Sequence, residues 1–133
     1  MAADFPRELH YTESHEWVRL DSDDTVLVGI SDFAQHQLGD LVFVELPDVH
    51  AALDQGDELS VVESVKTAAD VYAPISGEVI EVNQQLESRP ELINQDPYGD
   101  GWICRIKPTD LDELDELMDA DEYEAKVAED TEE

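Results

Sequence analysis

The chain has 133 residues and a mass of 14.9 kDa, which suits one domain and leaves too little for two separate cores. It carries 35 Asp and Glu against 7 Lys and Arg, a formal net charge of −28. This excludes nucleic acid and anionic membranes as main partners, because phosphate contacts need a basic surface. The single cysteine, Cys104, excludes an internal disulfide and a multi-cysteine metal site. We therefore expect one domain over residues 1–133, cytoplasmic and monomeric, with no metal site.

Short β-rich runs alternate with turn residues along most of the chain. Turns are expected where proline, glycine and aspartate gather, as in Pro74–Gly77 and Asp96–Gly101. Many short strands with such breaks favour a small sandwich or barrel, so the predicted fold class is mainly β. The predicted strands cover residues 16–20, 25–30, 41–45, 58–65, 70–73, 78–83 and 102–107.

Three helical segments interrupt the strands. Ser31 is placed to cap a short helix that ends at Gly39, a residue favoured just after a helix C-terminus. A C-terminal helical segment is predicted over 109–128, with leucines at helical spacing in its first half. Its second helix would begin at a capping box, Asp119-Ala-Asp-Glu122. Residues 129–133 have nothing to bury and are predicted to be a frayed acidic tail.

The acidic residues are spread along the chain. Residues 110–133 contain 13 of them, and the preceding 109 residues contain the other 22. Such a surface repels itself in dilute buffer and is screened in strong salt. We interpret it as an adaptation to a salt-rich cytosol in a halophilic organism. The alternative is an acidic interaction protein that docks a basic partner or mimics nucleic acid.

Lys66 lies between two apolar, β-branched runs, which predicts a hairpin with this lysine near its tip. Gly56 lies 10 residues before it and Gly77 lies 11 after it. A lysine on a rigid tip is what a swinging prosthetic arm needs, because its amine must protrude to be acylated. The alternative is an ordinary exposed lysine beside Glu63 and Asp70, in a surface ion pair of little energetic value.

The sequence around Lys66 resembles the lipoyl-lysine motif of the glycine cleavage system H proteins. The matching residues are ESVKTAAD at 63–70 and YAPISGEV at 72–79. Further blocks that resemble this family, in family order, lie at 11–19, 28–35, 38–47, 92–94 and 96–102. The resemblance covers residues 10 to about 127. It implies a hybrid barrel-sandwich fold of the biotinyl/lipoyl type, with short helices and a C-terminal helical segment.

The family resemblance also implies a function and a set of partners. Lys66 would carry (R)-lipoate in amide linkage, attached by a lipoate ligase or an octanoyltransferase. The arm would take the aminomethyl group of glycine from the pyridoxal-phosphate decarboxylase (P protein) and pass it to the aminomethyltransferase (T protein). Dihydrolipoamide dehydrogenase (L protein) would then reoxidise it. The chain itself would be a non-catalytic carrier.

By resemblance, four residues are candidates for a cleft that shelters the loaded arm: Ser14, Glu16, Ile30 and Asp70. Carboxylate and hydroxyl groups there would hold the cargo ammonium by charge-assisted hydrogen bonds. Simpler roles are available for each of them. Ser14 and Glu16 could be outward strand residues, Ile30 could belong to the core, and Asp70 could only solubilise the hairpin.

Two further residues match positions that the family uses for recognition by the lipoylating enzyme, Glu63 and Gly77. Gly77 could instead occupy a turn that needs permissive backbone dihedrals. Many family members have a histidine where Gln37 stands here, and His36 precedes it. One helical step turns a side chain by about 100°, so His36 is not expected to take that place. His15 is predicted to be structural, pointing away from Ser14 and Glu16.

Other carrier classes fit less well. A relay that passes lipoyl or octanoyl groups to other apo-proteins could use the same hairpin and stays an alternative. Biotin carriers favour methionine on both sides of their lysine, whereas Val65 and Thr67 flank this one. Lipoyl domains of 2-oxoacid dehydrogenases usually have Asp before and Ala after the lysine.

Overall fold

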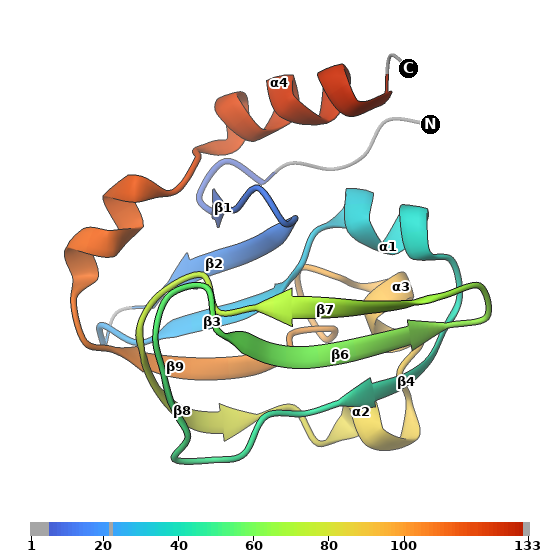
Figure 1. Ribbon diagram of the computed structural model, residues 1–133, viewed down its shortest axis with the longest axis horizontal. Coiled ribbons are helices and arrows are strands. Elements are labelled where there is room, and N and C mark those ends of the chain that lie inside the picture. Colours follow the sequence, from blue (N-terminus) through green and yellow to red (C-terminus); the bar gives the residue numbers. More distant parts are fainter. Residues whose placement is uncertain (1–5, 22, 132–133) are drawn as a thin grey trace.

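The structure, a computed structural model, describes residues 6–21 and 23–131. Two antiparallel sheets face each other and enclose one core (Figure 1). The larger sheet has the order β1 (His10–Tyr11), β2 (Glu16–Leu20), β3 (Val26–Ile30), β9 (Cys104–Pro108), β8 (Gly77–Val82), β5 (Ala52–Leu53). The smaller sheet has the order β4 (Leu41–Glu45), β6 (Glu58–Ser64), β7 (Ala68–Tyr72).

The core consists of aliphatic side chains contributed by both sheets. Val28, Val62, Val79 and Ile106 are at most 1% exposed and belong to one cluster. Along β6 the burial pattern largely alternates, as expected for a strand with one face on the core. These two sheets, with short helices beside them, confirm the predicted mainly β, barrel-sandwich fold.

Helix α1 (Asp32–Leu38) begins and ends where the sequence indicates. The Ser31 hydroxyl oxygen accepts a hydrogen bond from the Ala34 N–H at 3.2 Å. At the other end the Gly39 N–H donates to the Gln35 carbonyl, with a φ of +83° at the glycine. This left-handed value is one that glycine adopts without strain. The end of α1 is therefore fixed, and it lies beside the Lys66 loop.

The C-terminal segment differs in part from its prediction. Residues Leu111–Glu116 form a 3-10 helix, η1, instead of an α-helix. The spacing of three between Leu111 and Leu114 also fits a helix with three residues per turn. Helix α4 (Ala120–Thr131) begins at the predicted capping box, where Asp119 and Glu122 each accept the other's backbone N–H. It continues through residues 129–131, where a frayed tail is expected; residues 132–133 lie outside the described part.

Helix α4 packs over β1 and the start of β2 (Figure 1). The rings of Tyr11 and Tyr123 stack with centroids 4.5 Å apart. The Tyr123 hydroxyl also hydrogen-bonds the Ser31 hydroxyl at 2.6 Å. The C-terminal helix thereby supports the residue that starts α1. Among the described residues, no helix is long and apolar enough to cross a membrane.

Candidate functional site

Lys66 lies at the exposed tip of the β6–β7 hairpin, as predicted. The last paired residues of the two strands are Glu63 and Ala68. Ser64 then closes the turn, because its hydroxyl oxygen accepts the N–H groups of Lys66 and Thr67, both at 3.1 Å. The Ser64 N–H donates to the Thr67 carbonyl at 2.7 Å. The backbone at the tip is thus fixed, and the lysine side chain is exposed.

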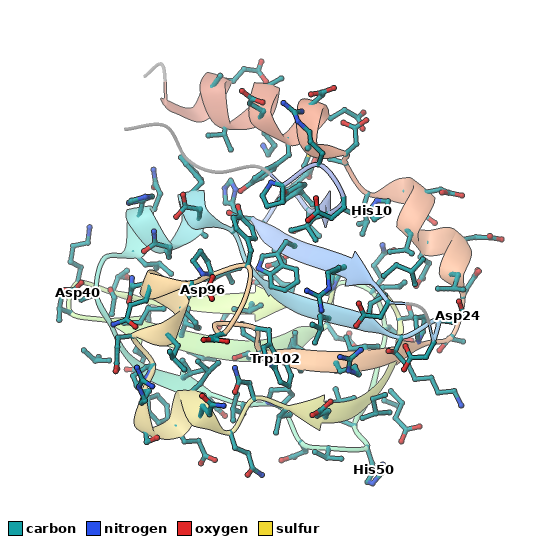
Figure 2. All side chains as sticks on the ribbon, turned by 180° about the vertical axis from the view of Figure 1, so that it is seen from behind. His10, Asp24, Asp40, His50, Asp96 and Trp102 are labelled. Carbon is teal, nitrogen blue, oxygen red and sulfur yellow. The ribbon has the colours of Figure 1, made fainter. Side chains whose placement is uncertain are left out.

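The tip is also attached to the chain between α1 and β4. The Val65 N–H donates to the carbonyl of Asp40 at 3.1 Å, and Figure 2 shows Asp40 at this end of the molecule. A Cβ at Gly39 would lie 3.2 Å from Lys66 Cε, so the lysine stem runs over this glycine. Lys66 therefore emerges beside the C-terminal end of α1.

Asn94, on the short helix α3 (Leu92–Gln95), holds this connection in place. Its side-chain oxygen accepts the Leu41 N–H at 2.9 Å, and its amide nitrogen donates to the Gly39 carbonyl at 2.9 Å. The sequence offers only the short Leu92–Asn94 block as a signal for this residue. Its role in positioning the Lys66 loop becomes visible only in three dimensions.

A cleft of about 160 Å³ lies between the outer edge of β7, helix α1 and the segment that leads into β2. The four predicted cleft residues, Ser14, Glu16, Ile30 and Asp70, all line it. Much of the remaining wall is apolar, formed by Phe33, Ala34, Leu38, Val62, Ala69 and Val71. Leu38 directly precedes Gly39, so the cleft reaches the end of α1 where Lys66 emerges. It can take an apolar chain that carries a cation.

Glu16 is the most buried acid in this cleft, at 1% exposed. One carboxylate oxygen accepts the Tyr72 N–H on β7 at 3.2 Å, and the other accepts the Thr12 hydroxyl. Burial raises the pKa of Glu16 above its usual value, and these two hydrogen bonds partly offset the shift. Its alternative role as an outward strand residue is wrong. A buried carboxylate in a cleft is suited to receive a cation.

The other cleft candidates differ in exposure. Ser14 and Asp70 are exposed at the rim. Ile30 is 4% exposed and belongs to the core cluster as well as to the cleft wall. The structure thus brings the four residues together, and their contact with a loaded arm remains a prediction.

Of the two candidates for lipoylation recognition, Glu63 lies on the hairpin and Gly77 lies outside it. Glu63 is exposed on β6 next to the tip. Gly77 is the buried first residue of β8, which begins at the end of the molecule opposite the tip (Figure 1). It needs space rather than permissive dihedrals, because its φ is not positive and an added Cβ would lie 2.3 Å from the Lys107 carbonyl oxygen. The turn interpretation of Gly77 is therefore wrong.

Substituting Gly77 with Ala is expected to lower the free energy of unfolding by about 1–3 kcal/mol, because the methyl group overpacks the contact with β9. Denaturant unfolding measures this loss. Gly56→Ala is the comparison for backbone strain without overpacking. Nothing lies within 4 Å of the Cβ position at Gly56, and only its φ of +92° is strained. If Gly77→Ala unfolds like the wild type and still slows acylation of Lys66, Gly77 acts in recognition and not in packing.

Gln37, His36 and His15 differ in whether they line the cleft. Gln37 lines it, whereas the His36 ring lies 3.5 Å from the Asp32 carboxylate and is not part of the lining. His15 also lines the cleft, and its ring accepts or donates a hydrogen bond to the Tyr123 hydroxyl at 2.9 Å. The prediction that His15 points away from Ser14 and Glu16 is wrong, because all three line the cleft. Strand alternation does not apply to His15, since β2 begins one residue later and the φ of His15 is +72°.

Cys104 is packed in the core. It is fully buried on β9, and burial raises the pKa of its thiol to about 12. At neutral pH it is therefore a thiol and contributes no nucleophile.

Two facing sheets and a lysine presented at a hairpin tip define the barrel-sandwich class of domain to which lipoyl and biotinyl carriers belong. Residues 9–130 match the profile of the family described as Glycine cleavage H-protein. The chain belongs to this family.

Named relatives agree with this assignment. The chain is 59% identical over 125 residues to a glycine cleavage system H protein of Coxiella burnetii, covering 94% of this chain and 96% of that one. It is 58% identical over 121 residues to one of Thermus thermophilus, covering 91% and 94%. The crystal structure of a glycine cleavage system H protein from Mycobacterium marinum is similar, with a TM-score of 0.85 at 40% identity, covering 92% of this chain and 98% of that one.

Proposed function

We propose that this chain is the lipoyl carrier of a glycine cleavage system and that Lys66 is its attachment residue. The observation that carries this proposal is the exposed amine at a rigid hairpin tip, beside a cleft with apolar walls and a buried carboxylate. A lysine with an acyl arm has a reach on the order of 14 Å, from bonds of about 1.5 Å each. Such an arm can extend into a partner or fold back along α1 into the cleft.

The residues around the cleft fit (R)-lipoate. The side chains of Phe33, Leu38 and Val62 offer an apolar wall for the hydrocarbon part of the arm. When bound, lipoate supplies a disulfide that is reduced as it takes up the aminomethyl group and is later reoxidised. The chain's own contribution is to hold the arm and to shield the cargo from water.

Glu16 and Asp70 would hold the ammonium group of the cargo. Glu16 is already fixed by Tyr72 and Thr12, so no further ordering of its side chain is needed. A cation beside this carboxylate would lower its pKa again and keep it ionised. The resulting charge-assisted hydrogen bond favours the protonated nitrogen, whose lone pair is then not available to assist hydrolysis.

In this role the chain catalyses no step and meets its partners in turn. These would be the P protein, which decarboxylates glycine, the T protein, which takes over the one-carbon unit, and the L protein, which reoxidises the arm. A lipoate ligase or an octanoyltransferase would load Lys66, and we expect all of this to take place in the cytoplasm with a monomeric carrier.

Reconstitution tests the proposal. P, T and L proteins of a relative, with tetrahydrofolate and NAD, should release carbon dioxide from glycine only when the lipoylated chain is added. The same chain before lipoylation is the matched control. If the lipoylated chain restores no more activity than the control, it is not the carrier.

We further propose that the acidic surface serves a salt-rich cytosol. Arg7, Arg19, Arg89 and Arg105 all lie within 4.0 Å of carboxylates, but acids outnumber Lys and Arg by 35 to 7. Basic side chains are therefore too few to pair with most carboxylates, and the repulsion among the carboxylates weakens as the Debye length falls from about 30 Å at 0.01 M to about 3 Å at 1 M salt.

The midpoint of thermal unfolding should accordingly rise with potassium chloride from low millimolar to molar concentration. Differential scanning fluorimetry at fixed pH measures this rise. Glucose at equal osmolarity serves as a control for effects that do not depend on charge. A midpoint that does not change with salt contradicts the proposed salt adaptation.

A further inference from the structure

The hairpin tip adjoins a group of apolar side chains that the fold leaves in solvent. Val42, Phe43 and Val65 are 56%, 48% and 69% exposed. We call these three residues the acylation patch. We propose that the enzyme that acylates Lys66 binds the chain through this patch. The inference rests on the proposed function and names a second part of the same recognition surface.

A β-bulge produces the exposed pair on β4. Leu41 is paired with Ser64 and Phe43 with Glu63, so β4 has one residue more than its partner β6 over this stretch. In a regular strand Val42 and Phe43 would point to opposite faces, and one would be buried. At the bulge both are exposed, while Leu41 and Val44 on either side are at most 3% exposed.

The patch is continuous with the Lys66 turn. Residues paired across neighbouring antiparallel strands have Cα atoms about 5 Å apart, so the Leu41–Ser64 pair brings the start of β4 next to the turn. The hydrogen bond from the Val65 N–H to the Asp40 carbonyl extends this contact to the tip itself. Val65 therefore makes a backbone contact that holds the Lys66 loop, and Val42 lies two residues after Asp40, its partner in this contact.

The residues around the acylation patch indicate what kind of protein surface would bind it. Asp40, Glu45 and Glu63 are exposed at its border, which gives an apolar centre with an acidic rim. Apolar side chains grouped on a highly charged surface typically mark a contact with another protein. A complementary partner has an apolar surface bordered by lysines or arginines. The opposite charges of the two surfaces would also raise the rate of association.

Distance from Lys66 selects one partner among those proposed. To form the amide, the Lys66 amine displaces the leaving group of an activated acyl donor, an acyl adenylate or thioester. The leaving group departs as AMP or thiol, and the amine loses a proton. The enzyme must therefore bring its active site to bonding distance of Nζ and cover the tip. The other partners work at the far end of an arm on the order of 14 Å long and need not contact the patch.

The test uses Val42→Thr together with Val65→Thr, which keeps the shape and strand preference of valine and adds a hydroxyl at exposed positions. The control is Val49→Thr, an equally simple change at a residue 44% exposed, next to His50 at the other end of the molecule (Figure 2). Each unacylated chain is titrated against lipoate ligase by calorimetry. Acylation of Lys66 is followed by intact mass, and reoxidation of fully lipoylated, reduced chain is followed with L protein.

We expect the double variant to bind the ligase about tenfold more weakly and to lose about tenfold in kcat/KM for acylation. The control should match the wild type, and reoxidation should be unchanged in every variant. An unchanged Kd for the double variant overturns the inference, as does an equal loss in reoxidation or a wild type that binds no acylating enzyme. A wild type that binds through the patch but is never acylated contradicts the proposed function and leaves the patch intact.

Discussion

Replacing Lys66 with Arg should reduce glycine-dependent release of carbon dioxide in the reconstituted system to the level without carrier. Arginine keeps the positive charge, but its guanidinium stays protonated and cannot be acylated. Because Lys66 is exposed, the fold should be unaffected, and the unfolding midpoint should stay within experimental error of the wild type. Intact mass after incubation with ligase should show no adduct.

Lys107 provides the matched control for this substitution. It is also exposed, and it lies on β9 in the larger sheet. Strand β9 contributes no residue to the cleft. Lys107→Arg should therefore be acylated and support full activity. Activity in the Lys66→Arg protein, with the fold intact, would remove Lys66 from the carrier mechanism.

Replacing Glu16 with Gln should have the second largest effect. The amide can still accept the Tyr72 N–H but has no negative charge for the cargo ammonium. A hydrogen bond to a charged group contributes about 1.5–3 kcal/mol, so spontaneous loss of the amine from the loaded carrier should become about 10- to 100-fold faster. The measurement is the decay of loaded carrier in buffer, without T protein. A decay rate equal to that of the wild type contradicts a role for Glu16 in holding the cargo.

The same substitution should also change the free energy of unfolding, and the size of this change should depend on pH. Burial raises the pKa of Glu16 in the folded state, so folding favours its protonated form. The stability that this proton contributes is fully present below the pKa of the unfolded chain and is lost as the pH rises through the folded pKa. Glutamine does not titrate. The stability of Glu16→Gln relative to the wild type should therefore increase from pH 4 to pH 8 in denaturant unfolding, and a constant difference contradicts the raised pKa.

Local signals in the sequence predict the elements that hold the site. Ser31 and Gly39 predict both ends of α1, and Asp119 and Glu122 predict the start of α4. The apolar runs on either side of Lys66 predict its hairpin, because strand residues and turn residues are close in sequence there. All of these signals depend on contacts between residues a few positions apart.

Features that depend on distant contacts could not be predicted in this way. The two-residue strands β1 and β5 exist because they pair with β2 and β8, and no pattern of two residues indicates a strand. Helix α2 (Gln85–Ser88) and helix α3 have no side-chain hydrogen bond at their N-caps. Gly77 gave a misleading signal, since its need for space comes from β9, about 30 residues later in the chain.

The cleft shows the same division. The resemblance around the motif blocks named Ser14, Glu16, Ile30 and Asp70, and the structure brings all four to one cavity. The sequence did not indicate that Glu16 is buried, because it directly follows a run of polar residues, Glu13 to His15. Its burial follows from the outer edge of β7, whose Tyr72 N–H it accepts from 56 residues away.

Peptide mapping by mass spectrometry of the chain purified from its own cells, grown with lipoate, tests lipoyl carriage most directly. We expect a lipoyl group on Lys66 and none on Lys107 or Lys126. Lys66 found unmodified under these conditions, or the adduct found on another lysine, would contradict the assignment of this hairpin as the attachment site.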